Sequence, residues 1–598
     1  MATTTMISKK SRFAGKKPYS IYSIAPVAAG CLMMLSSGSV YLVSVYSTRL
    51  QADLGVSSSD ISSYKTWLAI GSWVTLVPMM FTDFFGVKAT SIFGLLMVAS
   101  GYSVLSQMAN GNILTNSSII ILLGFIIGHG SAFCHVAAIS TNLANTSEES
   151  RGAVYGILMA NYALSSGVYS QLLSVLNIGI PTFLLICGVS MSCCVLLSYP
   201  SNHLLNNGEK TETLLVIPLA ITLTTGAVFV ALASILDMEF FHYGALGVGG
   251  VVILFVFFLS CGMLIFYPFN ALLPYKFNKS KSDSLEMNCL SFLIYSNDDH
   301  NNNGDNDDGE NQSLLNNENA NLNIGNDEEG EDTNLNVKVS PLHAYLTTPK
   351  QFMAGSSRKK SNKEEEETIP LYWYDILYDA RYWLLFFSFA IGSGSGLTVL
   401  YNIDRIVDTH IHSYDDDDTT TSQHYVLKTD AIALFSSFNA FGRIGFGFLS
   451  DWLLHKDIDI SRSWLLCVTC MMMGSGLLWM AFANLFTIKY AVSLVACAYG
   501  GFWVVIPSLM VDLYGLSSYF AYFSLTTASP IAGLELFYTL LSETLYNKNK
   551  INGSCYGHIA CFTDTFYILC GCNGAALIFA ILVASFPNAL KKTASASR

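Results

Sequence analysis

The sequence predicts an all-α polytopic membrane protein in which an extra helix pair separates two six-helix bundles. Low charge and long apolar runs are the two observations behind this prediction. Of the 598 residues, 52% are hydrophobic and only 12% are charged, and the mean hydropathy is +0.43. Soluble domains carry about 25% charged residues, whereas a helix needs about 20 mainly apolar residues to cross a bilayer. Because several runs reach that length, we expect the protein to fold in a membrane.

Fourteen apolar segments are expected to span the membrane in a 6 + 2 + 6 order. The first six lie near residues 23–47, 62–82, 88–109, 117–141, 152–173 and 179–199; two follow near 213–236 and 244–273; and six more lie near 382–401, 427–449, 463–483, 486–510, 515–541 and 565–587. The first segment follows a basic stretch and is too long for the core of a signal peptide. It is therefore interpreted as a retained span.

The distribution of cations predicts the orientation, because lysine and arginine are enriched in cytoplasmic loops. Alternation of the spans places on one side the basic amino terminus, Lys88, Arg151, Lys210, Lys276, Lys279, Lys281, Lys456, Arg462, Lys591 and Lys592. Fewer cations fall on the other side, chiefly Arg49, Arg405, Lys428, Lys548 and Lys550. Both termini are therefore expected in the cytoplasm.

The chain is expected to consist of six parts. These are a cytoplasmic basic tail (1–20), an N-terminal six-helix bundle (21–200), an extra transmembrane helix pair (201–273), a cytoplasmic linker (274–380), a C-terminal six-helix bundle (381–590) and a cytoplasmic tail (591–598). The linker is acidic and rich in asparagine, a composition that buries too little apolar area to fold, so disorder is expected. Within it, Glu310 to Leu315 fits an acidic dileucine sorting pattern, with a chance match as the alternative.

Two bundles joined by a linker are typical of a secondary transporter, which binds a small solute near the middle of the membrane. The sequence has no Walker-type phosphate loop, no metal or cofactor motif, no nucleophile–base constellation and no nucleic-acid-binding surface. We therefore expect no enzyme and no cofactor. The expected partners are the lipid bilayer and a small solute, with proton coupling left open, and the expected oligomeric state is a monomer.

Several solutes fit this interpretation: an organic anion or monocarboxylate-like metabolite, an amino acid, a cation or a metal chelate. A membrane receptor or sensor that keeps the fold without transport is the alternative function. Binding without flux in reconstituted vesicles would identify it. The expected location is the plasma membrane or a vacuolar or lysosomal-type membrane.

A glycine-rich run with one fixed cation, Asn439 to Asp451, stands at the expected cytoplasmic end of the eighth core span. Its glycines would let another helix approach closely. A similar D-x-x-G-x-[RK] turn follows the second span, and the two turns resemble the cytoplasmic loop motif of the major facilitator superfamily. The resemblance implies the major facilitator fold and a latch that closes the inner gate by capping a helix amino terminus. The residues assigned to this latch are Asp83, Lys88, Arg151, Arg443 and Asp451.

A narrower resemblance covers nearly the whole chain outside the linker. Its motifs are Gly38-x-x-Tyr41-x-x-x-x-Tyr46-Ser47-x-x-Leu50, Ser150-Arg151-Gly152-x-x-x-Gly156-Ile157-Leu158, Asn439-x-x-Gly442-Arg443, Gly500-x-x-Trp503-x-x-x-Pro507, Asp512-x-Tyr514-Gly515, Ala528-Ser529-Pro530-Ile531 and Cys555…Cys561-Phe562. Together they are similar to the nodulin-like branch of the superfamily, which is related to fungal monocarboxylate-transporter-like proteins. Members often have lysine at the position of Met159, so an anion held by that lysine is not implied here.

Polar groups inside a membrane are costly and often functional. The candidates for a substrate cavity are Tyr41, Tyr46, His129, His135, Asn161, Asn439, Trp503 and Glu535. For the histidines and the aromatic residues, hydrogen-bonded packing is the alternative. Glu535 is the only carboxylate deep in the eleventh core span, where desolvation would favour a proton on it; pairing near the outer surface is its alternative.

The 14 cysteines fall into two groups. Most lie within apolar segments and are interpreted as small core residues. Cys555 and Cys561 instead share the loop before the last span, which the expected topology places on the side where oxidation is permitted. Their short separation can bring the two α-carbons within bonding reach. A disulfide between them is therefore predicted.

Overall fold

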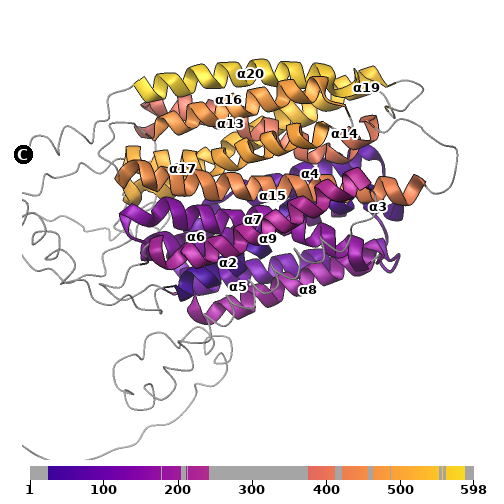
Figure 1. The fold of residues 1–598 in the computed structure, drawn as a ribbon. Coiled ribbons are helices and arrows are strands. Elements are labelled where there is room, and N and C mark those ends of the chain that lie inside the picture. Colours follow the sequence, from indigo (N-terminus) through magenta and orange to yellow (C-terminus); the bar gives the residue numbers. More distant parts are fainter. Residues whose placement is uncertain are drawn as a thin grey trace, which may run out of the picture. The chain divides into compact units, whose positions relative to one another are not determined.

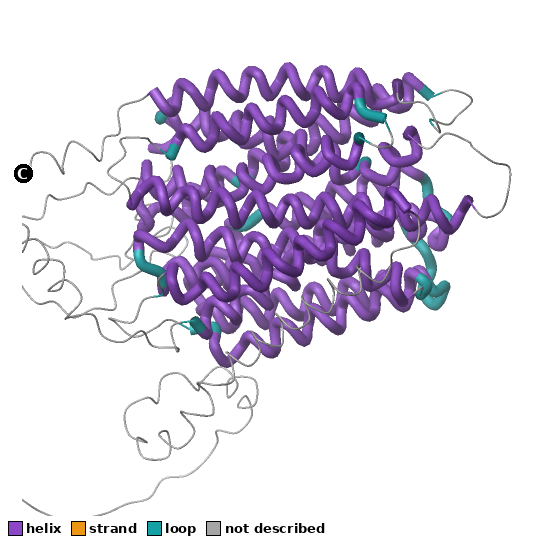
Figure 2. Tube along the Cα trace, viewed as in Figure 1, coloured by secondary structure: helices purple, strands orange, loops and turns teal. Residues whose placement is uncertain are grey.

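A computed structural model of the protein describes residues 24–176, 178–203, 211, 213–240, 375–410, 420–455, 462–484, 487–550, 555 and 560–585. The chain divides into two units, one of which is Asn270–Tyr345; the other comprises Met1–Phe269 and Leu346–Arg598 and contains every described residue. Helices dominate these described ranges (Figure 2), and the pairing of Thr146 with Thr211 is an isolated bridge. The described part of the chain is all-α, as predicted. The expected segment 244–273 and most of the linker lie outside it.

The amino half comprises the helices before the linker that correspond to the first bundle. They are α2 (Ala25–Ser37), η2 (Gly38–Leu42), α3 (Val43–Leu54), α4 (Ser58–Trp73), α5 (Leu76–Ala109), α6 (Ser117–Asn145), η3 (Glu148–Ser150), α7 (Arg151–Leu176), α8 (Ile180–Ser198) and η4 (Tyr199–Ser201). Gly55 ends α3 at φ 63°, and Gly86 separates two helical segments of α5 at φ 80°. Glycine reaches this left-handed region without steric cost. A capping box between Ser57 and Asp60 then begins α4.

The carboxyl half comprises the helices after the linker. They are η5 (Asp375–Tyr378), α13 (Ala380–Tyr401), α14 (Ile403–His410), α15 (Thr420–His455), α16 (Ser463–Phe482), α17 (Ile488–Thr526), α18 (Ala528–Leu534), the π-helix η6 (Glu535–Ser542), α19 (Glu543–Asn549) and α20 (Ala560–Ser585). Asp379 caps α13 by accepting a hydrogen bond from the Arg381 amide. The expected linker therefore ends earlier than residue 380, because η5 and this cap are ordered helical structure.

Helix α17 contains a reversal of the chain. The rings of Tyr514 and Tyr522 lie in T-shaped contact, with centroids 5.2 Å apart. Eight residues of straight helix would separate them by about 12 Å. The chain therefore turns between these tyrosines, and the rest of α17 begins the next crossing, which continues through α18, η6 and α19.

Ten of the described helices are long and apolar enough to cross a membrane. They match ten of the fourteen expected segments, which makes the chain a multi-pass membrane protein. The expected segments 62–82, 152–173 and 515–541 are helical but are not among the ten. The first segment is interrupted between α4 and α5, and the third is divided among α17, α18 and η6. The second segment forms α7, whose tyrosines and serines lower the mean hydropathy of that helix.

The two halves pack against each other mainly through α7 and α15 (Figure 1). Glycines allow this close approach: a Cβ atom added at Gly156 would lie 2.6 Å from the Arg443 carbonyl oxygen, and one added at Gly447 would lie 2.6 Å from the Gly152 carbonyl oxygen. Real Cβ atoms do not come so near a backbone oxygen. Small residues are the means by which helices associate closely in lipid.

A further helix, α9 (Thr213–Phe240), packs against both α7 and α15. Its start is fixed to the turn between α6 and α7: the Thr211 amide donates to the Asn145 carbonyl (2.8 Å), and the Thr213 amide donates to the Ser150 hydroxyl (2.9 Å). The first helix of the expected extra pair thus lies along the junction of the two halves.

Candidate functional site

Arg443 is fully buried between the two halves. It lies on α15, ten residues before the end of the span Lys428–Leu453. At 1.5 Å per residue this is about 15 Å from the end of a helix that crosses the whole bilayer. Arg443 therefore lies near the middle of this span, not at its end as the sequence predicted.

The guanidinium group of Arg443 bonds to three neutral acceptors from both halves. Nε donates to Asn439 Oδ1 (3.0 Å), Nη1 donates to the Met159 carbonyl oxygen (2.7 Å), and Nη2 donates to the Tyr41 hydroxyl (3.2 Å). A guanidinium has five N–H donors. Two of them, one on each terminal nitrogen, have no hydrogen-bond partner among the described residues.

Aromatic rings surround the same cation. The guanidinium carbon lies 5.9 Å from the ring centroid of Tyr41, 5.5 Å from that of Tyr162 and 5.9 Å from that of Trp503. The Tyr41 hydroxyl also shares a 2.7 Å hydrogen bond with Tyr499. Ring faces attract a cation within about 6 Å. We call Arg443 and these surrounding residues, Tyr41, Met159, Tyr162, Asn439, Tyr499 and Trp503, the arginine cage.

His135 borders the cage. Its imidazole meets the Tyr162 ring edge-on, with centroids 5.6 Å apart. Four of the residues predicted as cavity candidates, Tyr41, His135, Asn439 and Trp503, thus gather around Arg443.

The other cavity candidates lie elsewhere. Tyr46 shares a 2.8 Å hydrogen bond with Tyr64. His129 lies between Phe125 and Phe133 and bonds through Nδ1 to the Gly71 carbonyl at 3.2 Å, which is the packing alternative.

Asn161 and Glu535 are not part of the cage either. The Asn161 amide donates to the Ile157 carbonyl of its own helix at 2.9 Å. Glu535 is half-buried at the first residue of the π-helix η6. Neither side chain is among the three hydrogen-bond acceptors of Arg443.

Asp451 occupies the position that the latch motif implies. Its carboxylate accepts the amide N–H groups of Gly152 (3.0 Å) and Ala153 (2.7 Å) at the start of α7. Arg462 lies 3.5 Å from the same carboxylate and donates to Asp512 at 2.9 Å. A carboxylate at a helix amino terminus is favoured by the free N–H groups and the helix dipole. One half of the protein thus caps a helix of the other half.

The remaining latch residues are arranged differently. Asp83 is exposed just before the Gly86 turn of α5, and Lys88 lies over the ring of Tyr199, 5.7 Å from its centroid. Arg151 is the first residue of α7, directly before the two amides that bind Asp451. We call this end of the helices the Asp451 end.

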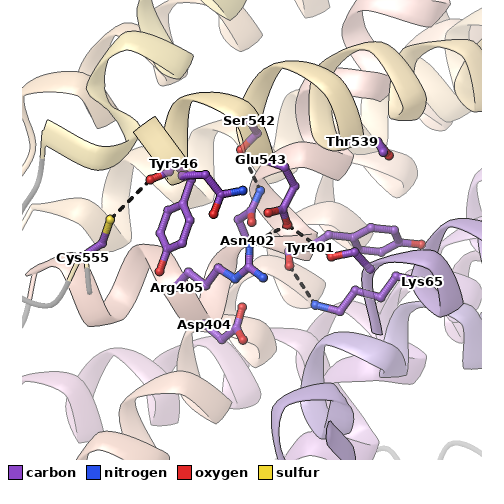
Figure 3. A network of polar contacts seen from close by, with 12 residues as sticks. Lys65, Tyr401, Asn402, Asp404, Arg405, Thr539, Ser542, Glu543, Tyr546 and Cys555 are labelled. Carbon is purple, nitrogen blue, oxygen red and sulfur yellow. Dashed lines mark hydrogen bonds and ion pairs between the residues drawn. The ribbon is translucent and has the colours of Figure 1, made fainter. Parts of the chain in front are cut away.

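A second polar network joins the halves at the opposite end, the Glu543 end (Figure 3). Arg405 and Glu543 form an ion pair at 2.6 Å. Thr48 of α3 donates to Asp404 at 2.7 Å, and Lys65 of α4 donates to the Tyr401 carbonyl at 3.2 Å.

The electrostatics of this end keep Asp404 charged. Burial raises the pKa of Asp404, but the charge of Lys65, the hydrogen bond from Thr48 and the charge of Arg405 outweigh burial and hold the pKa below its ordinary value of 3.8. Asp404 is therefore an ionised acceptor at neutral pH rather than a proton carrier.

The Cys555–Cys561 pair is bonded, as the sequence predicts. The α-carbons are 6.2 Å apart, within the normal disulfide range. Tyr546, on the helix before this loop, packs against Phe562 after it and lies over Arg405, whose guanidinium carbon is 5.0 Å from the ring centroid. The loop thus adjoins the Glu543 end.

Sequence reasoning missed Tyr162, Tyr499, Lys65, Asp404 and Glu543. The two tyrosines gave no signal, because aromatic residues make up 13% of the chain. Lys65 did give one, since it is a lone lysine inside the expected span 62–82, where a charge is costly. Asp404 and Glu543 come just after expected spans, and the sequence analysis did not single them out.

The fold and the cage define a class: a multi-pass membrane protein whose two helical halves enclose a buried cation. No protein-family model and no curated protein matches the chain.

Proposed function

We propose that the protein is a secondary transporter that moves a small organic anion across a membrane by alternating access. The observation that carries this proposal is the arginine cage. A permanently charged guanidinium in the middle of a membrane is expensive. Its three hydrogen-bond acceptors are neutral, and each terminal nitrogen keeps one N–H donor without an acceptor among the described residues, so two charge-assisted donors remain for an anion such as a carboxylate.

The contacts between the halves support alternating access. Polar groups link the halves at the Asp451 end and at the Glu543 end, and the cage lies between them. If either set of contacts releases, the cage becomes reachable from that side alone. This is the arrangement that a rocking transporter requires. The motifs that resemble the major facilitator superfamily and its nodulin-like branch agree with this proposal.

A direct test is a comparison of proteoliposomes incubated with a metabolite extract. Vesicles with the wild-type chain should accumulate one or a few organic anions that vesicles with Arg443→Gln do not. Lys550→Gln is the matched control, because it removes an exposed charge whose hydrogen bond goes to nearby Asn547. Identical contents in wild-type and Arg443→Gln vesicles would contradict the proposal.

The receptor alternative makes a different prediction in the same vesicles. A receptor would bind the anion without moving it, so wild-type vesicles would retain label on the protein but show no counterflow. The Asp451 end is proposed as the cytoplasmic side, with both termini there. Epitope tags after Arg598 should then be accessible only after permeabilisation; accessibility from outside would reverse the orientation.

A further inference from the structure

Four hydrogen bonds at the Glu543 end run in one direction across the interface, whereas the 3.4 Å bond between the Thr66 and Thr539 hydroxyls can run either way. Ser44, Thr48, Ser62 and Lys65 of the amino half donate to the Leu400 carbonyl (3.1 Å), Asp404 (2.7 Å), Glu543 (3.3 Å) and the Tyr401 carbonyl (3.2 Å) of the carboxyl half. When the halves separate at this end, these donors all stay with the amino half. The acceptors all leave with the carboxyl half.

Lys65 is the only one of these donors that carries a charge. It is 3% exposed, and its ammonium group points to the Tyr401 carbonyl from the side of α4 (Figure 3). The charged groups whose fields reach it are Asp404, Arg405 and Glu543. All three belong to the carboxyl half. Separation of the halves therefore removes the neutralising charge from Lys65.

Arg405 behaves differently from Lys65. Its partner Glu543 lies on α19, in the same half, and the ion pair measures 2.6 Å. Separation of the halves leaves this pair intact. Of the two cations in the network, only Lys65 becomes an uncompensated charge when the end opens.

Tyr401 connects this network with the cage. Its carbonyl oxygen holds Lys65, and its buried hydroxyl has no hydrogen-bond partner in the described part of the chain. The preceding residue, Leu400, accepts a 3.1 Å hydrogen bond from Ser44, which follows Tyr41 of the cage by three residues. Leu400 and Tyr401 together thus contact Lys65 and the segment that carries Tyr41 of the cage.

We propose that Lys65 is the first binding group for an anionic solute, which it receives when the Glu543 end opens and passes along Tyr401 to Arg443. This inference rests on the proposed transport function. It makes Lys65 a specificity-determining residue, because a cation that is unmasked only in the open state attracts anions and repels cations at the mouth of the path. In the closed state the same ammonium group holds the halves together through Tyr401.

The test uses a thiol probe, so that it does not depend on the identity of the solute. Ser44 lies in the chain between Tyr41 of the cage and Thr48 of the network, and of the four donors it is the nearest to Tyr41 along the chain. Ser44→Cys is introduced into a full-length background in which every cysteine except Cys555 and Cys561 is replaced by serine. The labelling rates with an anionic sulfonate methanethiosulfonate and a cationic trimethylammonium methanethiosulfonate are each divided by the rate with free cysteine.

The normalised rate should favour the anionic reagent about five- to tenfold, the effect of one nearby charge in a wet protein site. Lys65→Gln should bring this ratio close to one, and Lys65→Arg should restore it. Lys550→Gln, an exposed cation at the same end of the helices, should leave the ratio unchanged. Monodispersity in size-exclusion chromatography and a cooperative thermal unfolding transition show that each variant is folded.

Two other outcomes distinguish a failure of this inference about Lys65 from a failure of the proposed transport function. If the introduced thiol reacts but the ratio is the same with and without the Lys65→Gln substitution, the end opens and the role of Lys65 is overturned, while transport stands. If the introduced thiol reacts with neither reagent in any folded variant, the end never opens. That result overturns both alternating access and this inference.

Discussion

Arg443 combines a charge with a shape, and the two can be separated by substitution. Lysine keeps the charge but lacks the planar fork that would hold a carboxylate through two N–H bonds. Arg443→Lys should therefore weaken solute binding by about tenfold or more, roughly 1.4 kcal/mol. The expected result is a raised KM with a smaller change in maximal rate. An unaltered KM in a folded Arg443→Lys protein would show that the fork is not used.

Asp404 should stabilise the closed Glu543 end in a pH-dependent way. Because its folded pKa lies below the ordinary value of 3.8, its contribution is present above that value and is lost as the pH falls through the lower, folded pKa. Asp404→Asn should lower the thermal midpoint by a few degrees between pH 5 and 8. The difference should shrink below about pH 4. A difference that instead grows with acidity would contradict the assigned charge state.

At the scale of helices, the close contact between α7 and α15 depends on glycines, which have no side chain to hold the helices apart. Gly156→Leu on α7 would force a side chain into the Arg443 backbone, whereas a Cβ atom added at Gly445 of α15 meets nothing within 4 Å. Overpacking of this kind costs about 1–3 kcal/mol. Gly156→Leu should lower the thermal midpoint and slow transport, and Gly445→Ala should do neither. Equal behaviour of the two variants would show that the close approach is unimportant.

The latch at the Asp451 end is also a contact between two helices. Asp451→Ala removes the acceptor for two amides at the start of α7, which is typically worth about 1–2 kcal/mol. Removal should favour the state that is open at this end by roughly tenfold. Thiol labelling of a Ser450→Cys protein in sealed vesicles, at a buried position next to Asp451, should speed up accordingly. An unchanged rate would show that Asp451 does not hold this end closed.

The helices could be predicted from the sequence because apolar runs of span length have few other solutions in a membrane. The Asp451 latch was also predictable, since its aspartate stands in a local motif at a helix end. The cage was only partly predictable. Tyr41, Asn439 and Trp503 were recognisable as polar or aromatic groups in spans, but Arg443 contacts Met159 and Tyr41 across the interface. Residues hundreds of positions apart carry no periodic signal of such a contact.

The Glu543 end was not predicted for the same reason. Its bonds join α3 and α4 to α13, α14 and α19, and no local pattern pairs Thr48 with Asp404 or Lys65 with Tyr401. The sequence does place Lys65 in an apolar segment, and the cost of that charge was the available clue. A lone cation inside an expected span therefore merits the same attention as a recognised motif.

At the scale of the whole molecule, the central claim is that the two ends open in alternation around the cage. Spin labels at Ala52 and Lys548 report the distance across the Glu543 end, and labels at Glu149 and Leu449 report the distance across the Asp451 end; all four positions are exposed. Pulsed electron–electron distance measurement on wild type and on Asp451→Ala tests the claim most directly. The account predicts that Asp451→Ala lengthens the Glu149–Leu449 distance while the Ala52–Lys548 distance stays short or shortens. Distances that lengthen together, or that do not respond at either end, would contradict it.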